Sequence, residues 1–152
     1  MDAGEIPTGT DVPLASWGAR AVGALADGVI IGVPTYFMAL GLDVRSRIGY
    51  VYLDLVVSFV YSFFLVGFFG HTLGMGVLRL QAVEAREGRT PIGAVRAAIR
   101  SATAGLLSII PFGGLVDLLW PLWDPRNQTI HDKAAGTVVL SRKAQVLAPK
   151  QF

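Results

Sequence analysis

Two long apolar stretches dominate the pattern of hydrophobic and polar positions along the chain. The first runs from Trp17 to Leu42, and the second runs from about Gly49 to Gly70. A transmembrane helix needs about 20 consecutive, mostly apolar residues, and each stretch meets that length. The polar segment DVRSRI, residues 43–48, separates the two stretches. The pattern therefore predicts two full transmembrane helices joined by a short turn.

A third apolar stretch, residues 102–123, is interrupted near its centre by Pro111 and the glycine pair 113–114. It predicts either one kinked span or a re-entrant hairpin with two short legs. Basic residues favour the hairpin, because residues 71–101 contain five arginines and five Lys or Arg residues follow Trp123. Basic loops stay on the cytoplasmic side of a membrane, and only a hairpin leaves both groups there. We therefore expect both termini in the cytoplasm.

The polar segments outside these stretches predict a small cytoplasmic β element and an amphipathic helix. Residues 78–83 alternate between apolar and polar side chains, which is the period of a half-exposed strand. Residues 138–140 predict a second short strand, which we expect to pair with the first. Residues 91–100 predict a short helix with Arg96 and Arg100 on one face and apolar side chains on the other. A helix of this kind lies on an anionic leaflet.

The composition supports a membrane protein and excludes several function classes. Hydrophobic residues make up 53% of the chain and charged residues 16%, whereas soluble domains contain about 25% charged residues. The absence of cysteine excludes disulfides and thiolate metal sites, and two histidines are too few for a metal site. A net charge of +2 does not indicate nucleic-acid binding. The chain has no GxxxxGK loop and no GxSxG elbow, so we predict neither an enzyme nor a cofactor.

Two charged residues, Arg20 and Asp27, lie inside the first apolar stretch. Charges at such positions are costly and usually face a protein interior or a water-filled cavity. The two residues are seven apart, so they lie on nearly the same helix face but roughly 10 Å apart along the axis. Each is therefore expected to meet a partner from another segment. Three roles are open for Arg20: an interfacial anchor, a buried pair with Asp132 or Asp117, or a part in transport. For Asp27 the alternatives are a structural bond and proton or cation binding.

Gly28 and Gly32 form a GxxxG pair on the first helix. Such a pair lets another helix approach closely. The pattern predicts either helix packing within the chain or a contact between two copies.

Several motifs resemble the RDD family of bacterial membrane proteins, which is named for one arginine and two aspartates. They are the Trp17…Arg20-Ala21…Asp27-Gly28 pattern, the segments 72–74 and 78–80, and the closing segments 128–132 and 135–139. The resemblance covers residues 15–142 and leaves a cytoplasmic tail at 1–14 and a flexible tail at 143–152. It implies that Arg20 is the family arginine and that Asp27 and Asp132 are the two aspartates. The family often has a proline and a lysine where this chain has Leu73 and Met75.

We expect Arg20, Asp27 and Asp132 to form one polar cluster at the cytoplasmic end of the first helix, because an arginine there needs acidic partners. His131 and Asp117 are possible supporting residues. For Asp132 the simpler alternative is a cap on the segment that begins with Lys133. Asp117, beside two tryptophans, could also lie at the membrane interface.

The predicted fold is thus an all-α membrane protein in a bacterial plasma membrane, with a third re-entrant or kinked apolar element. The favoured function is that of a small structural or accessory subunit of a membrane assembly, with anionic headgroups around it. It would act as a homo-oligomer or with another membrane protein. The alternative is an oligomeric transporter or cation/proton exchanger that uses Asp27 and Arg20. Transport is also the activity that the family resemblance implies.

Overall fold

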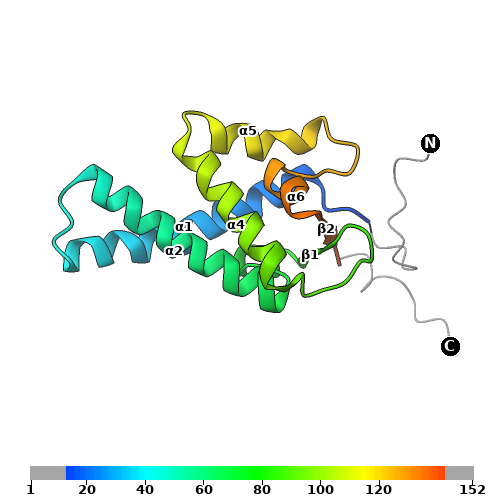
Figure 1. Cartoon of the computed structure of the whole chain (residues 1–152), viewed down its shortest axis with the longest axis horizontal. Helices are drawn as coiled ribbons and strands as arrows, with labels where there is room; N and C mark the ends of the chain where they lie inside the picture. Colours follow the sequence, from blue (N-terminus) through cyan, green and yellow to red (C-terminus); the bar gives the residue numbers. More distant parts are fainter. Residues whose placement is uncertain (1–12, 143–152) are drawn as a thin grey trace.

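The structure is a computed structural model, and it describes residues 13–142 of the chain. Two long antiparallel helices, α1 and α2, run side by side, and the remaining elements pack around the half of this pair that contains the start of α1 and the end of α2 (Figure 1). The elements are α1 (Trp17–Gly41), α2 (Arg47–Phe69), α3 (Leu73–Val77), β1 (Leu80–Glu84), α4 (Gly93–Ile109), α5 (Gly113–Leu119), the 3₁₀ helix η1 (Trp120–Leu122), α6 (Ile130–Ala135) and β2 (Thr137–Ser141).

Helices α1 and α2 are the two predicted transmembrane helices, and the structure confirms them. They contain 25 and 23 residues and are long and apolar enough to cross a membrane. The hydroxyl of Ser16 caps α1 by accepting from the Ala19 N–H, and Ser46 does the same for α2. Large apolar side chains along both helices are exposed, including Leu25 at 71% and Phe64 at 52%. Exposure of so much apolar surface to water is unfavourable, whereas lipid tails can cover it.

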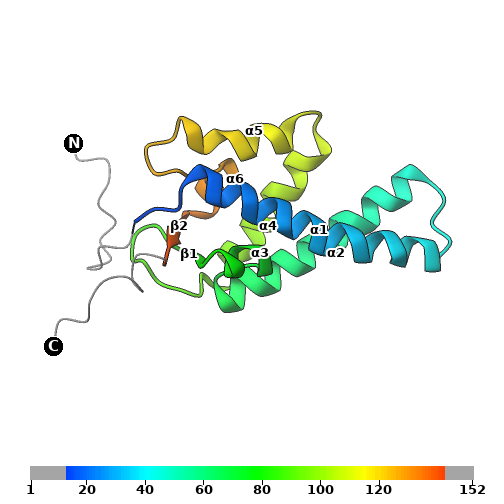
Figure 2. The same cartoon turned by 180° about the vertical axis from the view of Figure 1, so that it is seen from behind.

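The third apolar stretch folds as a helical hairpin and not as one continuous helix. Helix α4 ends at Ile109, the backbone of Phe112 is left-handed (φ 62°), and α5 runs back toward α6 (Figure 2). A Cβ on Gly113 would lie 2.3 Å from the carbonyl oxygen of Leu107, so only glycine fits this turn. The Trp17 indole donates to the carbonyl of Leu118 (2.9 Å) and fastens α5 to α1.

Helix α4 packs along α2. A Cβ on Gly67 would meet Ala97 at 3.0 Å, and one on Gly105 would meet Leu55 at 3.9 Å. The stretch of α2 from Gly67 back to Leu55 covers about 18 Å at 1.5 Å per residue. The tip of the α4–α5 hairpin therefore lies beside the middle of the two long helices, and not beside their far ends (Figure 1).

The predicted orientation of the amphipathic helix is wrong. The predicted segment is the start of α4, and its arginine face points into the protein: Arg96 pairs with Glu84, and Arg100 pairs with Asp132. The apolar side chain of Val95 is instead 74% exposed. Buried acids on β1 and α6 attract the arginines, and these acids lie far from α4 in sequence. The arginines of this helix therefore form ion pairs within the chain and do not face lipid headgroups.

The two predicted strands are present and pair with each other, but β1 begins two residues later than predicted, and its five residues are all buried, so the half-exposed strand is wrong. β1 and β2 are antiparallel, with a register from Leu80 opposite Ser141 to Glu84 opposite Thr137. Leu14 adds a bridge to β2, because the Ala15 N–H donates to Val139 (2.8 Å) and the carbonyl of Pro13 accepts from Ser141 (2.9 Å).

Residues 13 and 14 thus belong to the folded part and not to the predicted tail. The rest of the predicted tails, residues 1–12 and 143–152, lies outside the described residues. The main apolar core lies where the sheet meets α2, α3 and α4, and its buried members are Ala15, Val66, Met75, Leu80, Ala82, Ile92, Ala97 and Val139.

Candidate functional site

Asp132 is fully buried and lies in the first turn of α6. Its carboxylate accepts from the Thr129 N–H (3.2 Å), and the Thr129 hydroxyl accepts from the Asp132 N–H (3.2 Å). This reciprocal pair is a capping box, which satisfies two N–H groups that the helix itself leaves free. Thr129 and Asp132 are three residues apart, as the motif requires. The cap therefore fixes the position of the Asp132 carboxylate.

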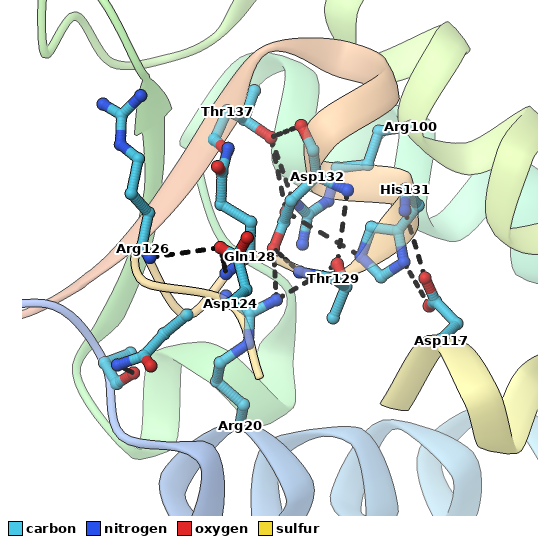
Figure 3. A network of polar contacts seen from close by, with 12 residues as sticks. Arg20, Arg100, Asp117, Asp124, Arg126, Gln128, Thr129, His131, Asp132 and Thr137 are labelled. Atoms are coloured by element: carbon cyan, nitrogen blue, oxygen red, sulfur yellow. Dashed lines mark hydrogen bonds and ion pairs between the residues drawn. The ribbon is translucent and has the colours of Figure 1, made fainter. Parts of the chain in front are cut away.

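Two arginines from other helices converge on this carboxylate (Figure 3). Arg20 of α1 binds its Oδ2 and Arg100 of α4 binds its Oδ1, and the arginine side chains are 8% and 10% exposed. The Arg100 guanidinium also donates to the hydroxyl of Thr137 (3.2 Å). Buried charges persist only when they are paired and hydrogen-bonded. The Arg20–Asp132–Arg100 triad therefore ties α1, α4 and α6 together.

Asp117 and His131 meet beside the triad. The Asp117 carboxylate accepts from the backbone N–H of His131 (3.0 Å) and from its ring Nδ1 (2.5 Å). Asp117 is 8% exposed, so it is a buried partner and not an interfacial residue as one alternative had it. Burial and the nearby Arg100 lower the pKa of His131 to about 4, against the opposing effect of Asp117. At neutral pH the ring is therefore uncharged and carries its proton on Nδ1.

The loop before α6 is held by Asp124. Its carboxylate forms an ion pair with Lys133 and accepts from the backbone N–H groups of Gln128 (2.9 Å) and Arg126 (3.1 Å). Partial burial raises the pKa of Asp124, but the Lys133 ammonium and these N–H groups outweigh it and leave the pKa below its usual value. The amide of Gln128 donates to the carbonyl of Thr137 (2.8 Å). These bonds fix the positions of Thr129 and α6 next to Arg20 and Arg100.

Asp27 does not join the cluster with Arg20 and Asp132, which corrects the prediction. Its Oδ1 accepts from the hydroxyl of Tyr61 (2.6 Å) and from the Gly74 N–H (2.8 Å), and its Oδ2 accepts from the hydroxyl of Thr72 (2.5 Å). These donors come from α2 and from the beginning of α3.

The bonds around Asp27 satisfy the free N–H groups at the start of α3. The Leu73 N–H donates to the Tyr61 oxygen (3.0 Å), and the Met75 N–H donates to the Thr72 hydroxyl (3.2 Å). Together with Gly74, the first three N–H groups of α3 reach the Asp27 carboxylate either directly or through one hydroxyl. A negative charge at a helix N-terminus is favourable. Asp27 thus links α1, α2 and α3.

Close helix packing on α1 occurs at Gly23, and not at Gly28 and Gly32. A Cβ on Gly74 would lie 2.3 Å from the carbonyl oxygen of Gly23, so α3 contacts the α1 backbone directly. A Cβ on Gly28 or Gly32 would meet nothing within 4 Å among residues 13–142. The prediction that this pair packs against another helix of the same chain is therefore wrong.

A cavity of about 380 Å³ separates the triad from the Asp27 bonds. It lies between α1, α2 and the α4–α5 hairpin, and both polar groups border it. The residues that line it are Arg20, Ala24, Asp27, Gly28, Ile31, Ser62, Val66, Thr72, Met75, Leu80, Arg100, Ala104, Gly114, Asp117, Leu118, Thr129, His131 and Val139. No group of His, Cys, Asp and Glu suited to holding a metal ion occurs in the described part of the chain.

Several residues of these sites were not predicted as site residues, among them Arg100, Tyr61 and Thr129. Thr129 carries a usable signal, because a threonine three residues before an acid is the mark of a capping box. Arg100 and Tyr61 carry no local signal, since their partners lie on distant segments.

Comparison with protein families gives one match. The model of the RDD family matches residues 14–136, which is most of the chain. Neither the curated proteins nor the solved structures contain a match.

Proposed function

Because this chain belongs to the RDD family and is an integral membrane protein, we propose that it is a small structural or accessory subunit of a larger membrane assembly. The observation that carries this proposal is the use of the family's three charged residues inside the fold. Arg20 and Asp132 are paired in the triad, and Asp27 holds the start of α3. A carrier site needs a charge that can exchange its partner, whereas these charges connect five helices of one chain, α1, α2, α3, α4 and α6.

The surface of α1 offers a place for a partner. Gly28 and Gly32 have open space beside them, and the neighbouring side chains of Leu25 and Val29 are 71% and 65% exposed. Small residues let a second transmembrane helix approach the backbone closely, which favours association in lipid. The partner in this proposal is a second copy of the chain or another membrane protein.

The proposal places the sheet on the cytoplasmic side of a bacterial plasma membrane. Arg79, Arg86 and Arg142 are exposed around the sheet, and basic residues favour the cytoplasmic face and its anionic headgroups. The start of α1 and the end of β2 are bridged through Leu14 and Leu140, so both lie on the same side. No chemical reaction is part of the proposal.

Purification in a mild detergent tests the assembly. We expect the parent protein to run as a complex with a stoichiometric partner or a second copy. The Gly32→Leu variant should lose it, because the added side chain fills the space beside α1. The matched control is Gly41→Leu at the end of α1, where a Cβ also meets nothing within 4 Å. A folded parent protein that is monomeric and without a partner in its native membrane would contradict the proposal.

The alternative is an oligomeric transporter or cation/proton exchanger that uses Asp27 and Arg20. The observation that favours it is the cavity, because both residues border it. A pH-sensitive dye inside proteoliposomes measures proton movement after addition of sodium or potassium. Under the structural proposal, the dye signal does not change after cation addition in proteoliposomes that contain either the parent or the Asp27→Asn variant. Cation-dependent flux in the parent, lost in a folded Asp27→Asn variant, would replace the structural proposal with transport.

A further inference from the structure

The cavity between α1 and the α4–α5 hairpin has the size and the walls of a small-molecule site. Its volume of about 380 Å³ lies within the range of about 300–1,000 Å³ that ligand pockets occupy. Apolar side chains such as Ile31, Val66 and Leu118 form much of its lining, and charged groups lie on one side. Mostly apolar walls with a few convergent polar groups are typical of a ligand pocket.

The Arg20 guanidinium borders the cavity with unused donors. Its side chain is 8% exposed, and its Nη2 binds Asp132 and the Thr129 hydroxyl. Its Nε and Nη1 find no acceptor within residues 13–142 and have almost no accessible surface. Buried donors without a partner are costly, and an acceptor in the cavity relieves that cost once the guanidinium turns toward it. Arg20 thus has two spare donors for an oxygen of a ligand.

The charges around the cavity favour an uncharged ligand. The lining contains two cations, Arg20 and Arg100, and two acids, Asp27 and Asp117, while burial keeps His131 uncharged by lowering its pKa to about 4. The two arginines are also paired with Asp132 behind the lining, so an anionic ligand meets no excess of positive charge. A neutral acceptor oxygen can use the spare Arg20 donors without bringing a negative charge close to Asp27 and Asp117.

The opening of the cavity is lined by small residues at membrane depth. Ala24 and Gly28 of α1 and Gly114 of α5 are exposed lining residues. Gly28 lies about 16 Å from the start of α1 at 1.5 Å per residue. With the start of α1 taken as the edge of the hydrocarbon core, this depth lies within the core, which is about 30 Å thick. A molecule that enters here comes from the lipid and not from water.

We propose that the cavity binds one uncharged lipophilic molecule that carries an acceptor oxygen, such as a ketone or an ester on an apolar chain. The molecule enters sideways from the bilayer past Ala24, Gly28 and Gly114. Its apolar part fills the cavity, and its oxygen lies at the Arg20 end.

Photolabelling in nanodiscs of phosphatidylcholine tests this proposal. The probe is a monoacylglycerol with a diazirine in its acyl chain, and mass spectrometry locates the labelled residues. We expect saturable labelling of α1 and α5 around Gly28 and Gly114. Gly28→Leu should reduce the labelling at least about tenfold, because the leucine occupies the opening. The matched control is Gly41→Leu at the end of α1, which lies outside the face proposed for a partner. A Cβ meets nothing within 4 Å at either position, so we expect both variants to keep the fold, but Gly41 does not line the cavity.

Competition then tests the acceptor oxygen. We expect 2-dodecanone to displace the probe at a concentration about tenfold lower than dodecane, since only the ketone accepts a hydrogen bond from the guanidinium. Equal labelling of the parent and Gly28→Leu would overturn the site. Equal competition by dodecane, or stronger competition by dodecanoate, would overturn the uncharged acceptor. The partner in the accessory proposal would cover the same face of α1 at Gly28, so the labelling is measured on the monomeric fraction of the purified chain, and its outcome is then independent of the accessory role.

Discussion

Asp132→Asn tests whether the charge of the buried carboxylate holds the fold together. Asparagine keeps a side-chain oxygen that can accept the Thr129 N–H, so the cap of α6 can survive. The substitution removes the negative charge that Arg20 and Arg100 share and leaves two guanidinium groups buried. It therefore isolates the electrostatic part of the triad.

The expected effect is large. Removing one partner of a buried ion pair costs about 3–5 kcal/mol, because the remaining charge stays desolvated. Both arginine side chains are about nine-tenths buried and lose the same partner. We therefore expect the free energy of unfolding to fall by about 4 kcal/mol. Proteins are typically stable by only about 5–15 kcal/mol, so the variant should unfold far more easily.

Equilibrium unfolding in mixed detergent micelles, followed by tryptophan fluorescence, measures the loss. Asp43→Asn is the control, because the Asp43–Arg45 pair is exposed (73% and 84%) and should contribute nothing measurable. In a double-mutant cycle, Arg100→Gln should cost much less in the Asp132→Asn background than in the parent. A loss below about 1 kcal/mol, or strictly additive changes, would refute the role of the triad.

Three further predictions concern the other contacts. Tyr61→Phe removes the hydroxyl between Asp27 and the Leu73 N–H and should lower the free energy of unfolding by about 1–3 kcal/mol; an unchanged unfolding midpoint would contradict the capping of α3. Gly74→Ala should prevent accumulation of folded protein, because its Cβ would lie 2.3 Å from a backbone oxygen, whereas Gly28→Ala should accumulate normally on size-exclusion chromatography; equal yields would contradict the close contact. Since the pKa of His131 is lowered from 6.5 to about 4, the unfolded chain takes up a proton first, so stability should be constant above pH 6.5 and fall by up to about 3 kcal/mol toward pH 4. This fall should shrink in His131→Gln, and an identical pH profile for both proteins would exclude His131 as its cause.

Local patterns predicted the elements whose signal lies within one segment. The lengths of α1 and α2 follow from long apolar runs, and the presence of β1 follows from the alternation of apolar and polar side chains over residues 78–81, although the strand is buried on both faces. The turn between α4 and α5 follows from Pro111 and the glycines beside it. These features depend on the residues nearby, so one sequence is enough to predict them.

Only one contact of the candidate site, the Arg20–Asp132 pair, could be predicted from the sequence. A buried arginine needs an acid, and the expectation that Arg20 meets Asp132 rested on that need. The same argument did not place Arg100, because an arginine on an amphipathic face is equally consistent with headgroups. Asp27 binds a five-residue helix that no hydrophobic period reveals. Which glycine contacts another backbone depends on where the segments meet, so Gly23 could not be distinguished from Gly28.

The pairing of Arg20 with Asp132 joins residues 112 positions apart in sequence. Arg20 is synthesised before Asp132, so it leaves the ribosome while α6 has not yet been made. Until then the arginine side chain has no acid from α6 and must stay near the headgroups or water. Helix α1 therefore reaches its final position only after α6 has been synthesised, and a chain that ends before α6 leaves Arg20 without its buried acid partner.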